Sequence, residues 1–230
     1  MIDDLVAANR ILADQKVLDA YGHVSLRHPD HRERYLLSRS RAPEIVEAGD
    51  IVEYDLDSNA LNGESRTSYL ERFIHGEIYR ARPDVMAVVH SHAPSVIPYA
   101  CSTVKLRPLF HMAGFLREGP EVFDIAKLFG PTDLLVKNRE QGAALAKTLG
   151  SHSIALMRGH GYVAVGRSLP IAVYRAIYTM VNAGLQESAV NLGGTVTYLD
   201  PAEADLASEN IEATIGRPWE LWKKKVTSPE

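Results

Sequence analysis

The chain has 230 residues, of which 46% are hydrophobic and 23% charged, and its formal net charge is −4. These values are typical of a globular domain with a sizeable core, and the negative charge argues against binding to nucleic acid or to an anionic membrane. Cys101 is the only cysteine, which excludes an intrachain disulfide. Because no basic, apolar leader follows Met1, we expect a cytoplasmic protein that forms one domain over residues 1–230.

The first part of the chain predicts one helix followed by three strands. Apolar residues recur with helical spacing over residues 3–19, and Gly22 is typical of a helix end. Three runs that read as strands follow over residues 23–27, 35–38 and 51–56, with turn residues between them. Connections this short favour antiparallel pairing of neighbouring strands.

Helices and strands alternate through the rest of the chain. The expected elements are a helix over 70–82, a strand leading into His90, a short helix over 95–101, a strand over 121–125, a helix over 138–149 capped by Asn138, strands on either side of His160, a helix over 169–192 and a helix that starts at Asp200-Pro201. This order predicts the α/β class: a single α/β/α domain with a central mixed, largely antiparallel sheet and helices on both faces.

The clearest chemical motif is the pair His90 and His92, at the end of the apolar run 85–89 and before Pro94. Side chains two residues apart on a strand point to the same face. Two imidazoles fixed in this way form half of a metal site, since Zn²⁺ and similar ions bind His nitrogen at about 2.0–2.1 Å. Taken alone, the pair also fits two buried, hydrogen-bonded and inert histidines.

Two further residues favour a metal site. His160 lies between Gly159 and Gly161, at the tip of the turn predicted between two apolar strands. The glycines allow positive φ angles and a close approach of the backbone, and a third ligand is a good reason for a histidine at such a tip. Glu71 begins the predicted helix 70–82 and offers a carboxylate upstream of the histidine pair.

In order and spacing, these motifs resemble the class II aldolase/adducin family over nearly the whole chain. The resemblance rests on Gly22-His23-Val24-Ser25, on Glu71 followed by His75, on His90-Ser91-His92 and on Gly159-His160-Gly161. It implies that His90, His92 and His160 hold a divalent metal ion, Mn²⁺ or Zn²⁺ with Co²⁺ or Fe²⁺ as further options, and that Glu71 is a ligand or the general acid/base. It also implies a homo-oligomer, usually a tetramer, with sites at the subunit interfaces.

The sequence departs from the sugar-phosphate aldolases of that family where they bind phosphate. The small residues expected there are replaced by His23, Ser40-Arg41 and Tyr69-Leu70, so a phosphate cradle is missing. Arg39 and Arg41 would share a face of an extended segment, and an arginine fork fits a carboxylate. We therefore expect Arg41, with Arg39 and Ser40, to bind the substrate; a plain surface charge is the alternative for either arginine.

A second departure concerns a tyrosine that members of this family donate from a neighbouring subunit. Its position is taken here by His111, whose ring titrates near neutrality. His111 is therefore a candidate catalytic acid that would reach a neighbour's metal, although a buried structural histidine is the alternative. His23 and His75, which stands one helical turn after Glu71, are expected to line or support the substrate pocket.

These motifs are most similar to the decarboxylase-like branch, whose members act on hydroxylated phthalates or on 3-hydroxy-2-methylpyridine-4,5-dicarboxylate. This resemblance implies a metal-dependent, non-oxidative carboxy-lyase acting on a hydroxylated aromatic or pyridine ortho-dicarboxylate, in which the metal stabilises the dienolate. Glu71 or His111 would supply the proton, and Arg41 would bind the remaining carboxylate. Two alternatives are a class II aldolase or epimerase acting on an unphosphorylated hydroxy, keto or sugar acid, and a non-catalytic, adducin-like scaffold.

Overall fold

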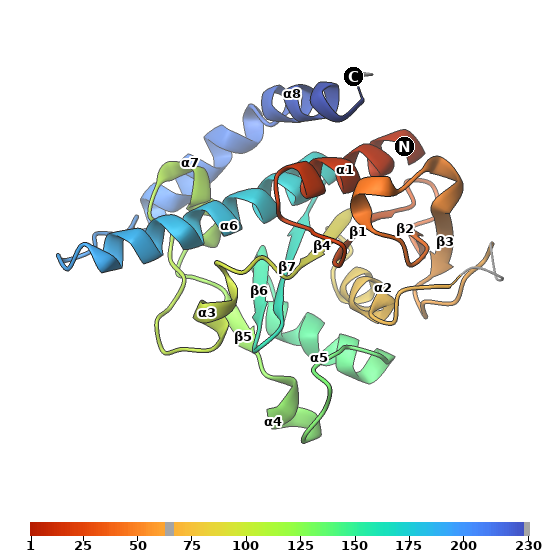
Figure 1. Ribbon diagram of the computed structural model, residues 1–230, viewed down its shortest axis with the longest axis horizontal. Helices are drawn as coiled ribbons and strands as arrows, with labels where there is room; N and C mark the ends of the chain where they lie inside the picture. Colours follow the sequence, from red (N-terminus) through yellow and green to blue (C-terminus); the bar gives the residue numbers. More distant parts are fainter. Residues whose placement is uncertain (63–66, 228–230) are drawn as a thin grey trace.

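A seven-stranded sheet forms the centre of the computed structural model, which describes residues 1–62 and 67–227 (Figure 1). The strands are β1 (His23–Arg27), β2 (Arg34–Ser38), β3 (Ile51–Asp55), β4 (Ala87–Ser91), β5 (Glu121–Phe123), β6 (Ile154–Met157) and β7 (Gly161–Gly166). Their order across the sheet is β3-β2-β1-β4-β7-β6-β5. All neighbours are antiparallel except β5 and β6, which are parallel, so the predicted mixed and largely antiparallel sheet is confirmed.

Helices cover both faces of this sheet, as predicted. They are α1 (Ile2–Asp14), α2 (Arg72–Ala81), α3 (Ile97–Ala100), α4 (Ile125–Phe129), α5 (Arg139–Leu149), α6 (Leu169–Asn191), α7 (Pro201–Ala213) and α8 (Gly216–Thr227), with short 3-10 helices at Pro43–Ile45, Ala48–Asp50 and His111–Leu116. Helices α1 and α6 lie on one face, with α8 outside them, and α2 and α5 pack together on the other (Figure 1). Among the described helices, none combines the length and the apolar character needed to cross a membrane.

The alternation of side chains along β4 divides the core into two layers. Ala87 and Val89 pack in the cluster that contains α1 and α6, whereas Val88 packs in the cluster that contains α2 and α5. A strand buried on both faces has a continuous apolar sequence, which explains the run before His90. Because His90 is two residues after Val88, its side chain points toward the α2 face.

The predicted helix caps are confirmed at two places. The side chain of Asn138 accepts a hydrogen bond from the backbone N–H of Gln141 and starts α5, which ends before Gly150. The side chain of Asp200 accepts from the N–H of Glu203, whose own side chain bonds back to Asp200, and Pro201 occupies the first turn of α7. These local contacts supply backbone groups that a helix start leaves without partners.

The first helix is shorter than its apolar pattern predicts. It ends at Asp14, and Lys16 adopts a positive φ of 60°. Val17 and Leu18 are nevertheless buried, because their N–H groups both bond to the carbonyl of Leu12 and fold them back onto the core. The apolar spacing therefore reports burial correctly beyond the point where the helix stops.

The predicted strand over 121–125 is also shorter in the structure. β5 ends at Phe123, because the side chain of Asp124 accepts a hydrogen bond from the N–H of Ala126 and begins α4. The apolar Ile125 is buried, but on a helix instead of a strand.

Candidate metal centre

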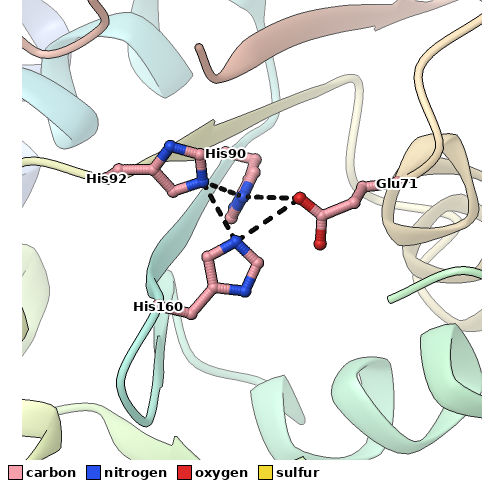
Figure 2. A group of neighbouring side chains, drawn as sticks. All are labelled: Glu71, His90, His92 and His160. Atoms are coloured by element: carbon pink, nitrogen blue, oxygen red, sulfur yellow. Dashed lines mark hydrogen bonds and ion pairs between the residues drawn. The ribbon is translucent and has the colours of Figure 1, made fainter. Parts of the chain in front are cut away.

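Four side chains from three separate segments converge beyond the end of β4. Figure 2 shows Glu71, His90, His92 and His160 around one point, and their ligand atoms all lie within 4.8 Å of one another. Nε2 of His92 is 2.9 Å from Nε2 of His90 and 3.0 Å from Nε2 of His160. Oε2 of Glu71 is 3.4 Å from Nε2 of His90 and 3.4 Å from Nε2 of His160. The structure thus brings together the four residues that the sequence pointed to.

The backbone of β4 and the residues after it aim the first two histidines. His90 is fully buried in the strand, and His92 lies just beyond its end. Between them, Oγ of Ser91 donates to the carbonyl of Val17 and accepts from the N–H of Ala93. These two bonds fix the chain as it leaves the sheet, so that the side chains of His90 and His92 remain on the same side.

Two glycines bring His160 to this pair. His160 occupies the turn between β6 and β7, where Gly159 has a φ of 65° that side-chain-bearing residues rarely adopt. A Cβ at Gly161 would lie only 2.1 Å from the carbonyl oxygen of Ser91. Glycine at position 161 is therefore required for the hairpin to pack against the end of β4, which places the imidazole of His160 beside that of His92.

Backbone carbonyls fix the orientation of two of the imidazole rings. Nδ1 of His90 lies 3.2 Å from the carbonyl oxygen of Tyr162, and Nδ1 of His160 lies 3.0 Å from that of Leu134. A carbonyl can only accept, so each Nδ1 carries the hydrogen and donates it. The lone pair of each ring is thereby left on Nε2, which faces the cluster, as in protein metal sites generally.

Residues 134–136 orient two of the four groups without supplying a ligand. The carbonyl of Leu134 holds His160, and the N–H of Val136 donates to Oε1 of Glu71 at 3.0 Å. Leu134 itself has a positive φ of 68°, unusual for a residue with a side chain. Because one carboxylate oxygen is occupied by Val136, the other, Oε2, is left to face the histidines.

The charges within the cluster favour a bound cation. Burial acts to raise the pKa of Glu71, but the neighbouring His90 and His160 outweigh it and lower that pKa, so the carboxylate stays ionised. Burial, followed by the proximity of His90, lowers the pKa of His92 to about 4. His160 behaves differently, since the neighbouring carboxylate of Glu71 and the carbonyl of Leu134 together outweigh burial and raise its pKa.

The donor set fits a divalent metal ion. Neutral imidazole nitrogens whose lone pairs face one another repel unless a hydrogen or a cation lies between them. Two nitrogens bound to one ion at about 2.1 Å each would lie about 3.0–3.4 Å apart, close to the separations seen here. Imidazole nitrogens with one carboxylate oxygen suit Zn²⁺, Mn²⁺, Co²⁺ or Fe²⁺, and the donor types alone do not select among them.

The cluster lies against a hollow of about 470 Å³. Glu71 and His92 form part of its lining, together with the predicted residues His23, Ser40 and Arg41. Tyr69 and Leu135 also line this hollow. One hollow therefore joins the metal-binding groups to a cationic side chain, which is the arrangement expected for an anionic substrate.

Arg39 and Arg41 do share a face, but a carboxylate of the protein already lies between them. Nε of Arg39 is 2.6 Å from Oδ1 of Asp50, and Nη1 of Arg41 is 2.9 Å from Oδ2 of the same residue. Asp50 is buried, and both arginines help to hold its pKa below the usual range against the effect of burial. Nη2 of Arg41 also lies 3.9 Å from the exposed carboxylate of Glu47, and of the two arginines Arg41 is the one that lines the hollow.

His23 and His75 lie one behind the other. His23 lines the hollow, whereas His75 is fully buried and has both ring nitrogens in hydrogen bonds, to His23 and to Ser25. The predicted contribution of His75 to substrate binding would therefore pass through His23. It stays a prediction, as do the substrate contacts of Arg39, Ser40 and Arg41.

His111 does not join the cluster of its own chain in the part of the chain that the structure describes. It begins the 3-10 helix His111–Leu116, is exposed, and borders a small cavity beside Tyr174 and Arg175. Its predicted action on a neighbouring subunit stays a prediction.

Sequence reasoning missed Asp50, Ser25 and Tyr79. Asp50 is distant from any motif, and only its contact with both arginines reveals its role. Ser25 and Tyr79 had a signal: Ser25 is two residues after His23 on a strand, and Tyr79 is one helical turn after His75. Both therefore point to the same side as a histidine already selected.

Comparisons with known proteins identify the family of the chain. The model of the family described as Class II Aldolase and Adducin N-terminal domain matches residues 3–187. The chain is 39% identical to the decarboxylase tropJ of Talaromyces stipitatus, with 96% of this chain and 92% of tropJ covered. It is 33% identical to a 3,4-dihydroxyphthalate decarboxylase of Arthrobacter keyseri, with 88% and 83% covered.

Solved structures support the fold. The chain is similar to L-fuculose 1-phosphate aldolase from Glaciozyma antarctica PI12, with a TM-score of 0.78 at 20% identity. The similarity covers 98% of this chain and 88% of that aldolase. At this level of identity, the match establishes the architecture and carries no conclusion about activity.

Proposed function

The chain belongs to the class II aldolase and adducin family, in its decarboxylase-like branch, and on that premise we propose that it is a metal-dependent, non-oxidative decarboxylase of a hydroxylated aromatic or pyridine ortho-dicarboxylate. The observation that carries this proposal is the opening of the Glu71, His90, His92 and His160 cluster into the hollow that also contains Arg41. The decarboxylases among its relatives support the same reaction type.

The reaction breaks the bond between a ring carbon and a carboxylate carbon. CO₂ leaves, the electron pair stays on the ring, and a proton must then reach the ring carbon. A divalent ion held by the three histidines would act as a Lewis acid for that electron pair. Glu71 or His111 is proposed to hold and deliver the proton, and Arg41 to bind the carboxylate that is retained.

Arg41 fits this role because an ion pair with Asp50 holds one edge of its guanidinium in place. Asp50 occupies Nη1, while the side chain remains 24% exposed and borders the hollow. An arginine held in place loses less conformational freedom when it binds an anion than a free one does. The retained carboxylate of an ortho-dicarboxylate is the anion we assign to it.

The metal itself is proposed to be Mn²⁺ or Zn²⁺, with Co²⁺ or Fe²⁺ as alternatives. Elemental analysis of purified protein should find close to one such ion per chain, either directly or after reconstitution. Protein that takes up no divalent ion under any condition would remove the metal from the proposal.

The decisive experiment measures CO₂ release from a panel of substrates. The panel contains hydroxylated phthalates, hydroxypyridine dicarboxylates and hydroxybenzoates with a single carboxylate. We expect turnover to be confined to dicarboxylates that carry a ring hydroxyl beside the departing group, because that hydroxyl allows the ring to accept the electron pair. Equal turnover of mono- and dicarboxylates would refute the assignment of Arg41.

Aldol cleavage is the competing outcome, since it also leaves an electron pair on carbon beside an oxygen that a metal can bind. Aldehyde release from unphosphorylated hydroxy or keto acids should therefore be measured with the same protein preparation. Efficient aldehyde release without CO₂ release would replace the decarboxylase by an aldolase.

We further propose that the active form is a homo-oligomer, with four subunits as the expected number, in which His111 acts on a neighbour's hollow. His111 is exposed and borders a different cavity from the one beside the cluster of its own chain, which supports this arrangement. If each site takes its cluster from one chain and His111 from another, mixing inactive His90→Ala and His111→Ala chains in equal amounts should restore activity at up to about a quarter of the sites. Verified subunit exchange without any recovery would place His111 outside the site.

A further inference from the structure

A line of four hydrogen-bonded side chains runs from the hollow into the core. Nδ1 of His23 lies 2.6 Å from Nε2 of His75, and Nδ1 of His75 lies 2.6 Å from Oγ of Ser25. Oγ of Ser25 lies 2.7 Å from the phenol oxygen of Tyr79. None of the four side chains belongs to the metal cluster, and each is at most 3% exposed.

The far end of this line fixes the direction of every bond in it. In the described part of the chain, Oγ of Ser25 is the one acceptor within hydrogen-bond distance of the Tyr79 hydroxyl. The backbone N–H of Val88 also faces the phenol oxygen, but an N–H can only donate. Tyr79 must therefore donate to Ser25, because the reverse direction would bury its hydrogen without a partner, at a cost comparable to a lost hydrogen bond.

The remaining bonds follow from that first one. Ser25, which accepts from Tyr79, donates its own hydrogen to Nδ1 of His75. A neutral imidazole that accepts at one nitrogen carries its hydrogen on the other, so Nε2 of His75 donates to Nδ1 of His23. His23 then carries its hydrogen on Nε2, the nitrogen that is not bound within the line.

Both imidazoles in the line are neutral. A second hydrogen on His75 would make its Nδ1 a donor to Ser25 and leave the hydrogen of Ser25 or of Tyr79 without an acceptor, and a second hydrogen on His23 would set two N–H groups against each other. In neutral rings the line has one consistent set of hydrogens, so the tautomer of His23 does not depend on the solvent at the mouth of the hollow.

We infer that His23 presents a fixed Nε2–H donor to an anionic oxygen of the substrate, and that His75, Ser25 and Tyr79 are positioning residues that set its tautomer. The inference rests on the proposed function for the chemical class of that oxygen, a carboxylate or a phenolate. It also gives the hollow a polarity: both Arg41 and His23 donate, so the substrate edge that meets them must consist of acceptors.

The tautomer can be measured without any turnover. Protein labelled with ¹⁵N at histidine and loaded with diamagnetic Zn²⁺ gives two-bond nitrogen–hydrogen correlations that separate the two ring nitrogens, and the His23→Gln variant identifies the signals of His23. We expect Nε2 of His23 to carry the hydrogen. A hydrogen on Nδ1 of His23 would overturn the inference, whatever reaction the protein catalyses.

The donor role is tested by binding phthalate, a dicarboxylate without the ring hydroxyl needed for turnover. Loss of one hydrogen bond to a charged group should weaken binding about ten- to a hundredfold in His23→Leu. His23→Gln, which places an amide N–H at a similar reach, should recover most of the affinity. Equal losses in the two variants would show that His23 acts only by filling space.

Tyr79→Phe tests the positioning role with the ring kept in place. Removing the hydroxyl should leave His23 as a mixture of tautomers and weaken phthalate binding severalfold, with an unchanged Zn²⁺ content. Tyr99→Phe is the matched control, because Tyr99 is also buried and its hydroxyl donates to a carbonyl, that of Ala183, outside the line. An unaltered His23 tautomer in folded Tyr79→Phe would contradict the proposed direction of the line.

The outcomes separate this inference from the proposed function. A fixed Nε2–H on His23 with donor-dependent phthalate binding, but no CO₂ release from any substrate, would reject the decarboxylase and keep the donor. CO₂ release combined with a hydrogen on Nδ1 of His23 would support the decarboxylase and reject the role of His23 as a fixed donor.

Discussion

The two walls of the hollow are built by different means. On the metal side, His90 and His160 are aimed by donating to the backbone carbonyls of Tyr162 and Leu134. Glu71 is aimed by accepting from the backbone N–H of Val136. On the other side, the arginines follow the end of β2 and are aimed by a single buried side chain, that of Asp50.

This difference determines how each wall can fail. A backbone carbonyl or N–H survives almost any substitution, so the metal side should respond mainly to changes in its own four residues. The arginine side depends on one carboxylate that a single substitution removes. We therefore expect the metal side to tolerate changes in the residues around it, and the arginine side to be altered by substitution of Asp50 alone.

The largest effects are expected from the metal side. His90→Ala, His92→Ala and His160→Ala should each abolish metal retention and reduce kcat/KM by about a thousandfold or more, because the Lewis acid contributes several kcal/mol of transition-state stabilisation. Metal content and steady-state kinetics are the measurements.

His31→Ala is the matched control, since His31 is exposed and its nearest acidic partner, Glu33, is 3.8 Å away. Removal of the metal from the unaltered protein with a chelator should reproduce the loss of activity, and adding the ion back should reverse it. Any of the three variants that keeps both metal and activity would be removed from the ligand set.

On the arginine side, Arg41→Ala should reduce kcat/KM by about a hundredfold or more. The reason is that the retained carboxylate of the substrate then loses its charged partner. Arg41→Lys keeps the charge but not the planar fork, so most of the loss should remain. Metal content should stay unchanged in both variants. Normal kinetics in Arg41→Ala would show that the retained carboxylate binds elsewhere.

Asp50→Asn sharpens the contrast, because it leaves Arg41, the proposed substrate-binding residue, in place and removes the carboxylate that aims it. The freed arginine gains conformational freedom, so KM should rise severalfold while kcat changes little. Glu44→Gln is a suitable control, since Glu44 is an exposed carboxylate on the neighbouring 3-10 helix Pro43–Ile45. If kcat fell and KM stayed constant, Asp50 would act on the reaction itself.

A smaller effect is expected on the pH dependence of the free energy of unfolding, through the buried side chain of His75. The unfolded chain binds a proton at His75 below about pH 6.5, whereas the folded chain does so only near the pKa of about 3. Between these values the unfolded state binds more protons, so the free energy of unfolding should fall as the pH falls, by up to about 1.4 kcal/mol per pH unit for this group. Urea unfolding at several pH values, with a chelator present, should show a shallower slope in His75→Gln; an unchanged slope would contradict the buried, neutral state of His75.

The sequence was sufficient to predict the metal side because its residues lie on regular elements or directly at their ends. The spacing of His90 and His92 determines their common direction once a strand is assumed, and a glycine on each side of His160 marks a turn. The packing of the hairpin against β4 was not predictable from spacing, since it depends on the contact between Gly161 and the carbonyl of Ser91.

The arginine side could be predicted only in outline. Alternation along an extended segment correctly placed Arg39 and Arg41 on one face, but their shared partner Asp50 lies after a 3-10 helical stretch whose path no local pattern encodes. Helix ends showed the same limit. α1 stops at Asp14 although the apolar spacing continues to Leu18, because Val17 and Leu18 are buried without being part of the helix.

Residues 134–136 have a consequence for how this domain could diversify. Their backbone holds both His160 and Glu71, and Leu135 borders the hollow, yet no substitution there alters a coordinating atom. An insertion of one residue between Leu134 and Val136 would therefore change the orientation of both His160 and Glu71. A sequence alignment would still show all four cluster residues unchanged. Exchange of this loop between homologous proteins offers a way to vary metal preference and substrate shape together, and sequence surveys that track only the four ligands would overlook it.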